Sequence, residues 1–295
     1  MKSIVSYLPV LKRFSQAFFL ILFNFDFVTF VNSFRMHKAA ISKSYFKRIC
    51  IPGMNCYSCP AATGACPIGS LQFWLNDTAL KLNLGEKINY IGFYIIGFIT
   101  LVGASVGRLF CGFACPFGFL QDMISKITKL NYNIPKVFRF IKYITLVLFV
   151  FVLPFFFVDI SVLSPWFCKL LCPVGTLEAG IPLLLVDEGL RKASGFLTIF
   201  KFVILFLFLI SFFFSKRSFC KILCPLGAIW GVLNKVSLLQ LTINRNTCTR
   251  CKICESKCPM NIEILKNPNS VECIRCFECV NNCPNRSISI KFGRK

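Results

Sequence analysis

The sequence predicts a mainly α-helical, polytopic membrane protein that ends in a small α+β domain. Hydrophobic residues make up 56% of the 295 residues and charged residues 16%, whereas soluble domains carry about 25% charged residues. The other two observations are four long apolar segments and, after the last of them, a repeated cysteine spacing. We therefore divide the chain into a membrane domain, residues 1–238, and a C-terminal domain, residues 239–295.

Four segments are long and apolar enough to cross a bilayer, which takes about 20 residues. They lie near residues 14–34, 88–107, 140–158 and 196–214. The first resembles the apolar region of a signal peptide, but no small-residue cleavage site follows it, so we expect a retained anchor. Asn24 and Asp26 lie in the middle of it, where a polar contact between helices or a shallower span is the simplest interpretation and proton handling by Asp26 is the alternative.

Basic residues outnumber acidic ones, 34 Lys and Arg against 12 Asp and Glu, and give a formal net charge of +22. They are scattered beside the apolar segments, as the positive-inside rule describes, and Arg108, Arg217 and Lys221 count among these flanking charges. Nucleic-acid binding would require a basic face on a soluble domain. We therefore expect contact with membrane lipid and no nucleic-acid partner.

Eight of the 18 cysteines repeat one spacing in the C-terminal domain. The run C-x2-C-x2-C-x3-C-P begins at Cys248 and again at Cys273, and it is the run of bacterial two-cluster ferredoxins, in which the fourth cysteine ligates the other cluster. A zinc site or disulfides would leave both repeats and both prolines unexplained. The expected ligand sets for two [4Fe-4S] clusters are Cys248, Cys251, Cys254 and Cys283, and Cys273, Cys276, Cys279 and Cys258.

A second motif, C-P-x-G, recurs at intervals of about fifty residues in the membrane domain. It begins at Cys66, Cys115, Cys172 and Cys224, and the last three have a partner four residues earlier, at Cys111, Cys168 and Cys220. Proline suits the first position of a helix, and the cysteine before it lies at the positive end of the helix dipole, which favours a thiolate. Metal binding is the favoured interpretation and purely structural cysteines the alternative.

The sidedness follows from the C-terminal domain. Because iron–sulfur clusters are normally built in the cytoplasm, we expect both termini there, in a multi-pass protein of the cytoplasmic membrane. Residues 35–87 contradict this pattern, since they carry seven Lys and Arg against two acids yet would lie outside. The cytoplasmic side would hold a complete set for a third cluster, namely Cys111, Cys115, Cys220 and Cys224. The opposite side would hold six cysteines, two more than a fourth cluster needs: Cys50, Cys56, Cys59, Cys66, Cys168 and Cys172.

With these motifs the chain resembles the membrane-bound polyferredoxins of the NapH and NosR type over most of residues 88–295. The resemblance implies that the paired membrane cysteines and the eight C-terminal cysteines bind clusters, and that electrons pass from quinol or through the membrane to a redox partner protein. Residues 52–72 and the pair Cys168 and Cys172 resemble instead a related group of membrane 4Fe-4S proteins of anaerobes. This departure speaks against a nitrate-specific role.

The leading hypothesis is therefore an electron-transfer subunit that links a membrane quinone pool or an extracytoplasmic partner to a cytoplasmic one. The alternatives are a transmembrane thiol–disulfide reductant that uses Cys56 and Cys59, and a redox-sensing or maturation protein without turnover. No haem is expected, because His37 is the only histidine, and the chain has no nucleotide motif of a stand-alone dehydrogenase. Glu178 and Asp122 are candidate carboxylates for quinone chemistry, with helix capping as their simpler role.

Overall fold

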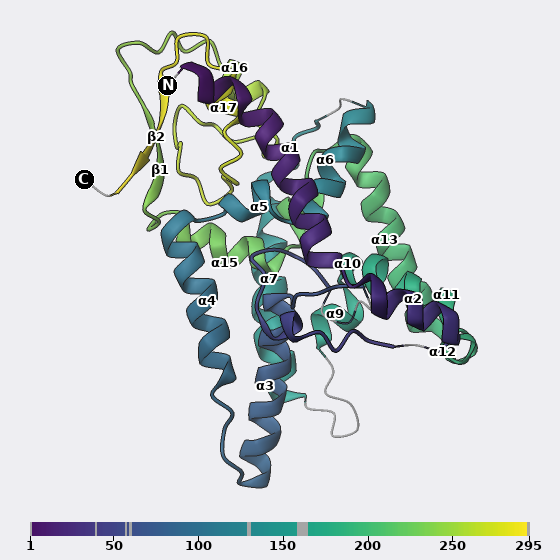
Figure 1. Cartoon of the computed structure of the whole chain (residues 1–295). Helices are drawn as coiled ribbons and strands as arrows, with labels where there is room; N and C mark the ends of the chain where they lie inside the picture. Colours follow the sequence, from purple (N-terminus) through teal and green to yellow (C-terminus); the bar gives the residue numbers. More distant parts are fainter. Residues whose placement is uncertain are drawn as a thin grey trace.

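The computed structural model describes residues 2–38, 40–56, 58, 61–128, 131–157 and 165–293. Most of these residues are helical, and the C-terminal domain contains a two-stranded sheet (Figure 1). The helices are α1 (Lys2–Asn24), α2 (Phe27–Met36), α3 (Pro67–Leu84), α4 (Ile91–Val106), α5 (Leu109–Phe113), α6 (Pro116–Thr128), α7 (Ile141–Thr145), α8 (Leu153–Phe156), α9 (Trp166–Leu170), α10 (Pro173–Gly175), α11 (Ile181–Val186), α12 (Glu188–Ala193), α13 (Phe196–Phe214), α14 (Ser218–Ile222), α15 (Pro225–Leu233), α16 (Ile253–Ser256) and α17 (Glu278–Asn281). Short 3-10 and π segments are η1 (Tyr45–Arg48), η2 (Lys136–Phe140), η3 (Leu146–Val152) and η4 (Thr176–Gly180).

Among the described residues, two helices are long and apolar enough to cross a membrane. They are α13 and the helix Lys136–Phe156, which joins η2, α7, η3 and α8. A third is present if Leu8–Asn24 and α2, bent by 50° from each other, form one span. The predicted span 88–107 forms α4, whose 16 residues reach about 24 Å, less than the roughly 30 Å of a hydrocarbon core. By length, the structure therefore contains two or three of the four predicted spans.

The first predicted span is interrupted where Asn24 and Asp26 lie. The carboxylate of Asp26 caps α2 by accepting hydrogen bonds from the backbone N–H of Thr29 at 3.3 Å and from its hydroxyl at 3.0 Å. It also accepts one from the Ser42 hydroxyl. A capping carboxylate satisfies amides at the start of a new helix, so Asp26 marks the point where α1 ends and α2 begins in a new direction.

Prolines explain the two π-helical turns. Pro154 follows η3 and Pro182 follows η4. A proline ring lacks an N–H and clashes with the carbonyl four residues before it, and a wider π turn accommodates this loss. In η4 the residue four before Pro182 is Glu178, so the proline shapes the turn that carries this partly buried carboxylate.

The C-terminal domain is a doubled structure. Strand β1 (Leu239–Ile243) pairs antiparallel with β2 (Ile288–Phe292), so the sheet joins the two ends of the cysteine region. Between the strands, three residues of the first cysteine run have positive φ, and their equivalents 25 residues later do as well. The pairs are Arg250 with Arg275, Lys252 with Phe277, and Asn261 with Arg286. Left-handed backbone is costly for such residues, and its repetition indicates that both runs bend around a centre in the same way.

Buried polar contacts join this domain to the helices. Asn234, just after α15, donates to the carbonyls of Cys273 at 2.6 Å and Ser270 at 3.2 Å. Glu272 forms ion pairs with the buried side chains of Arg108, at 3.4 Å, and Lys142. The domain also lies beside the first half of α1, near the N-terminus (Figure 1). It is therefore packed on the membrane domain and shares one hydrophobic core with it.

Candidate cluster-binding sites

Two cavities in the C-terminal domain are each lined by four cysteines. One has about 330 Å³ of empty space and the other about 340 Å³. The first is lined by Cys248, Cys251, Cys254 and Cys283, and the second by Cys258, Cys273, Cys276 and Cys279. In each cavity the fourth cysteine comes from the other run, which is the crossed arrangement expected from the spacing.

A third cavity of about 310 Å³ lies in the membrane domain and also has four cysteines in its wall. These are Cys111, Cys115, Cys220 and Cys224. Pro116 and Pro225 begin α6 and α15, and the Cys224 sulfur caps α15 by accepting a hydrogen bond from the Gly227 N–H at 3.3 Å. The three cavities thus share their size and their number of thiols, which suits one common type of group.

Two buried arginines lie at the third cavity, Arg108 in its wall and Arg217 on the carbonyl of Cys111, and neither was predicted as a site residue. Each precedes a cysteine pair by three residues, as Arg108 precedes Cys111 and Arg217 precedes Cys220. A Cβ on Gly227 would lie 2.8 Å from the Arg108 guanidinium, and one on Gly118 would lie 3.1 Å from that of Arg217. The motif glycine of each unit therefore makes room for the arginine of the other unit. The signal in the sequence is R-x2-C-x3-C-P-x-G, present twice.

Glutamines six residues after the first two C-P cysteines show which units face each other. Gln121 donates to the Cys220 sulfur at 3.3 Å, and Gln72 donates to the Cys168 sulfur at 3.5 Å. The unit of Cys115 is thus paired with the unit of Cys220, and the unit of Cys66 with that of Cys168. The second pairing defines a fourth group of thiols.

The fourth group contains Cys56, Cys66, Cys168 and Cys172. Burial raises the pKa of the Cys168 thiol well above its usual range, and the nearby Cys172, Cys66 and Cys56 raise it further. A Cβ on Gly175 would lie 3.7 Å from the Cys56 sulfur and 4.0 Å from that of Cys172. Cys50 lies outside this group but beside Cys66.

Cys59 lies outside the described residues. The other seventeen cysteines form no disulfide, and no group of described His, Cys, Asp and Glu side chains is close enough to hold a single metal ion.

Buried positive charge around the cavities exceeds buried negative charge. Arg108, Arg217, Lys142, Lys221 and Arg275 are at most 1% exposed, whereas the carboxylates paired with them are the buried Glu272 and the partly buried Asp122. Within the part of the chain that the structure describes, the side chain of Lys221 donates only to Ser215 and Asn261, and Nη1 of Arg275 has no hydrogen-bond partner. A cubane with four thiolates carries about −2 in its oxidised form, so the donor sets and the surrounding cations both fit [4Fe-4S] clusters.

The two candidate quinone carboxylates differ in their surroundings. Burial would raise the pKa of Asp122, but the guanidinium of Arg217, at 2.6 and 2.8 Å, holds it well below its usual range. Asp122 is therefore a fixed counter-ion. Burial raises the pKa of Glu178 to about 8, and the N–H of Cys56 donates to its carboxylate at 2.6 Å. Glu178 takes the sequence position that Gln72 and Gln121 hold in their own units.

The third cavity has close neighbours on two sides. A Cβ on Gly112, beside Cys111, would lie 2.8 Å from the carbonyl oxygen of Ile274 and 3.5 Å from the Cα of Cys276. The third cavity therefore adjoins the second C-terminal one. On its other side, Gly53 packs on Cys115 and Met54 lines the cavity, only two residues before Cys56 of the fourth group.

Comparisons with known proteins agree with this arrangement. A family model described as a 4Fe-4S binding domain matches residues 88–135, 143–184 and 197–244, and one described as a 4Fe-4S dicluster domain matches residues 240–284. A Methanocaldococcus jannaschii protein without an assigned role is 31% identical over 73% of this chain and 83% of its own length. The ferredoxin-type protein NapH of Haemophilus influenzae is 26% identical over 64% of this chain and 67% of its own.

The regulatory protein NosR of Stutzerimonas stutzeri is 26% identical over 63% of this chain but only 26% of its own length. No solved structure matches. From its relatives, its matched domains and its apolar helices, the chain belongs to the membrane-bound ferredoxins of the NapH and NosR type, which are iron–sulfur electron-transfer proteins.

Proposed function

We propose that the chain relays electrons between a quinone or extracytoplasmic redox partner near Cys56 and a cytoplasmic partner near Cys251. The observation that carries this proposal is the presence of four thiol groups, with the third cavity packed next to the second C-terminal one. Cys251, in the first C-terminal cavity, is exposed, whereas all four cysteines of the third cavity are buried. Exchange with a soluble partner therefore belongs at the Cys251 end.

The residues of each group have defined tasks. The thiols would hold [4Fe-4S] clusters, which supply one-electron chemistry when bound. Arg108 and Arg217 balance the added negative charge, and Gln72 and Gln121 orient a sulfur each. Oxidation of one quinol releases two electrons and two protons. Glu178, a partly buried carboxyl beside Cys56 whose pKa is raised to about 8, is the residue best placed to exchange a proton at that end.

The sidedness of the proposal rests on α1 and the C-terminal domain. Lys12 of α1 pairs with Glu278 of α17 at 3.4 Å, which ties the beginning of α1 to the C-terminal domain. We place both on the cytoplasmic side of a multi-pass protein, where iron–sulfur clusters are normally assembled, with residues 1–238 as the membrane domain and 239–295 as the cluster-binding tail.

Iron content and quinol oxidation test the proposal. Anaerobically purified full-length protein should contain about 16 iron atoms per chain, four for each cluster, and Cys111→Ala/Cys224→Ala should contain about 12 and lose one EPR signal. In vesicles, a quinol should reduce the C-terminal clusters of the wild type and not those of the double variant. Iron near 8 per chain would contradict the relay. It would favour the alternative in which the membrane thiols take part in thiol–disulfide exchange.

A further inference from the structure

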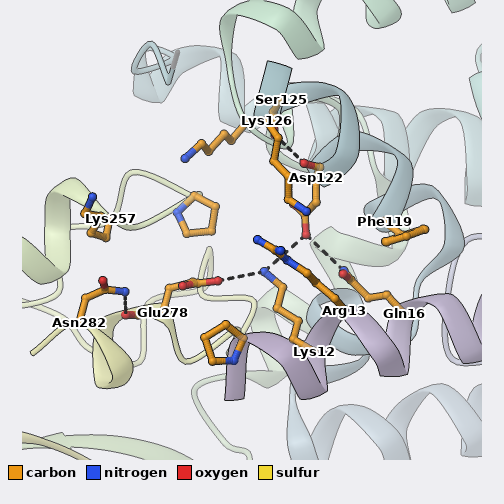
Figure 2. Close-up of a pocket in the computed structure, with 13 residues that line it drawn as sticks. Lys12, Arg13, Gln16, Phe119, Asp122, Ser125, Lys126, Lys257, Glu278 and Asn282 are labelled. Carbon is orange, nitrogen blue, oxygen red and sulfur yellow. Dashed lines mark hydrogen bonds and ion pairs between the residues drawn. The ribbon is translucent and has the colours of Figure 1, made fainter. Parts of the chain in front are cut away.

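A large cavity outside the four thiol groups lies where the membrane domain meets the C-terminal domain. It has about 860 Å³ of empty space, and its walls come from α1, α6, Lys216 after α13, and the C-terminal residues Lys257, Pro259, Glu278 and Asn282 (Figure 2). Its inner wall includes the buried side chains of Lys12, Gln16 and Ser125. No step of the proposed electron transfer uses this cavity.

The cavity is strongly basic. Five cations line it, against the carboxylates of Asp122 and Glu278. Lys12 lies between these two, 3.5 Å from Asp122 and 3.4 Å from Glu278 (Figure 2). Asp122 is already held by Arg217, which lies outside the cavity. The other four cations form no ion pair with any described residue. These are Arg13, Lys126, Lys216 and Lys257.

Two of these cations lie close enough to affect each other's charge. Burial lowers the pKa of Lys126, and the charge of Arg13 lowers it further. Like charges held together around a hollow repel each other unless a group of opposite charge lies between them. The cavity therefore has the charge and the size of an anion-binding site.

Exposed apolar side chains beside the cations indicate which kind of anion it is. Phe14 follows Arg13 on α1, and Met123 and Ile127 flank Lys126 on α6. Lys216 follows the end of α13, one of the two long apolar helices. Basic residues at the ends of apolar helices, with apolar side chains next to them, match the headgroup region of a bilayer, where basic pockets between helices bind anionic lipids.

We propose that this cavity binds the phosphate-bearing headgroup of an anionic phospholipid, with the acyl chains along Phe14, Met123 and Ile127. Lys257 and Pro259 flank Cys258 of the second C-terminal cavity, so the bound headgroup joins α1 and α6 to the cluster-binding tail. The inference rests on the membrane location of the chain and is independent of the direction of electron flow.

Native mass spectrometry of the full-length, iron-loaded protein tests this site. Delipidated protein in detergent receives an equal mixture of phosphatidylglycerol and phosphatidylcholine. The wild type should retain phosphatidylglycerol preferentially, and Lys126→Ala/Lys257→Ala should bind it roughly 30-fold more weakly, as expected for two cations at a membrane surface. The matched control, Arg286→Ala/Lys291→Ala, removes two exposed cations elsewhere and should bind like the wild type.

Two further measurements distinguish between the possible ligands and between the possible causes of weak binding. Titration with inorganic phosphate alone should give much weaker binding, and equal binding would show that the site takes a soluble anion and overturn the proposal. Equal retention of both lipids by the wild type would overturn it too. It would indicate that the cations bind an acidic partner protein instead. Iron per chain is measured in every variant, so that loss of the lipid site and loss of the clusters are told apart.

Discussion

At the scale of single residues, the third cavity depends on two cysteine units that each place an arginine in the space left by the glycine of the other unit. Arg108 and Arg217 occupy space that Gly227 and Gly118 leave open, and each guanidinium lies beside buried thiols. An arginine remains charged even when buried, so this arrangement fixes two positive charges next to the cavity without dependence on pH.

Replacing Gly227 by alanine should remove the space that Arg108 occupies. The new Cβ would lie 2.8 Å from the Arg108 guanidinium, which is held in place by Glu272 and the carbonyl of Val271. We expect a loss of about 1–3 kcal/mol of stability through overpacking and about four fewer iron atoms per chain. Gly97→Ala is the control, because a Cβ there meets open space on α4. Thermal unfolding and iron analysis measure both effects, and an unchanged Gly227→Ala variant would contradict the role of Arg108.

Arg275 should set the reduction potential of the second C-terminal cluster. Its buried guanidinium lies in the wall of that cavity and has one unpartnered nitrogen. Because positive charge favours the more negative, reduced form, Arg275→Gln should lower the potential by on the order of 50 mV at an effective dielectric near 20. Arg275→Lys should shift it less. The exposed Arg245→Gln, screened by solvent, should leave it unchanged in an EPR-monitored redox titration, and an equal shift in this control would refute the assignment.

At the scale of elements, α5 is the contact between the membrane domain and the C-terminal domain. Gly112 lies against the carbonyl of Ile274 and the backbone of Cys276, so α5 packs there with no side chain in between. Such close packing keeps the third cavity next to the second C-terminal one. The short helix thus determines the spacing of two cluster sites.

A side chain at position 112 should widen this spacing without touching a ligand. In Gly112→Val the first added carbon would lie 2.8 Å from the Ile274 carbonyl, so α5 and the C-terminal domain must move apart. We expect full iron content but several-fold slower reduction of the C-terminal clusters by quinol, since electron tunnelling falls steeply with distance. Gly195→Ala, which meets no neighbour, serves as the control. Stopped-flow absorbance follows the reduction, and an unchanged rate would exclude this contact from the path.

At the scale of the whole molecule, local spacing predicted some features of the chain, and features that depend on distant contacts were missed. The grouping of thiols in the C-terminal domain followed from cysteine spacing, because each run bends around its own centre. In the sequence, Arg108, Arg217 and Lys221 have the positions of flanking charges, yet all three are buried, because the neighbouring cysteine units enclose them. The break at Asp26 was missed because hydropathy averages over a capping residue.

The sequence alone left the membership of the fourth thiol group undecided for the same reason. Six cysteines were candidates, and the choice among them depends on how Gly53, in the loop between α2 and α3, packs against Cys115. No periodicity in the sequence records that contact. Gln72, which identifies the facing unit, becomes informative only when Gln121 is seen to make the same bond.

The integrity of the whole path should depend on Cys56 and not on its neighbour Cys50. Cys56 belongs to the fourth group, at the far end of the proposed path, whereas Cys50 lies beside Cys66 but outside that group. Cys56→Ala should contain about 12 iron atoms per chain, and Cys50→Ala about 16. In Cys56→Ala, dithionite should still reduce the C-terminal clusters because their own ligands are intact. Quinol should not, because the path is then cut where electrons enter it. Quinol-driven reduction of Cys56→Ala at the wild-type rate would place the entry point at another group and remove the fourth one from the relay.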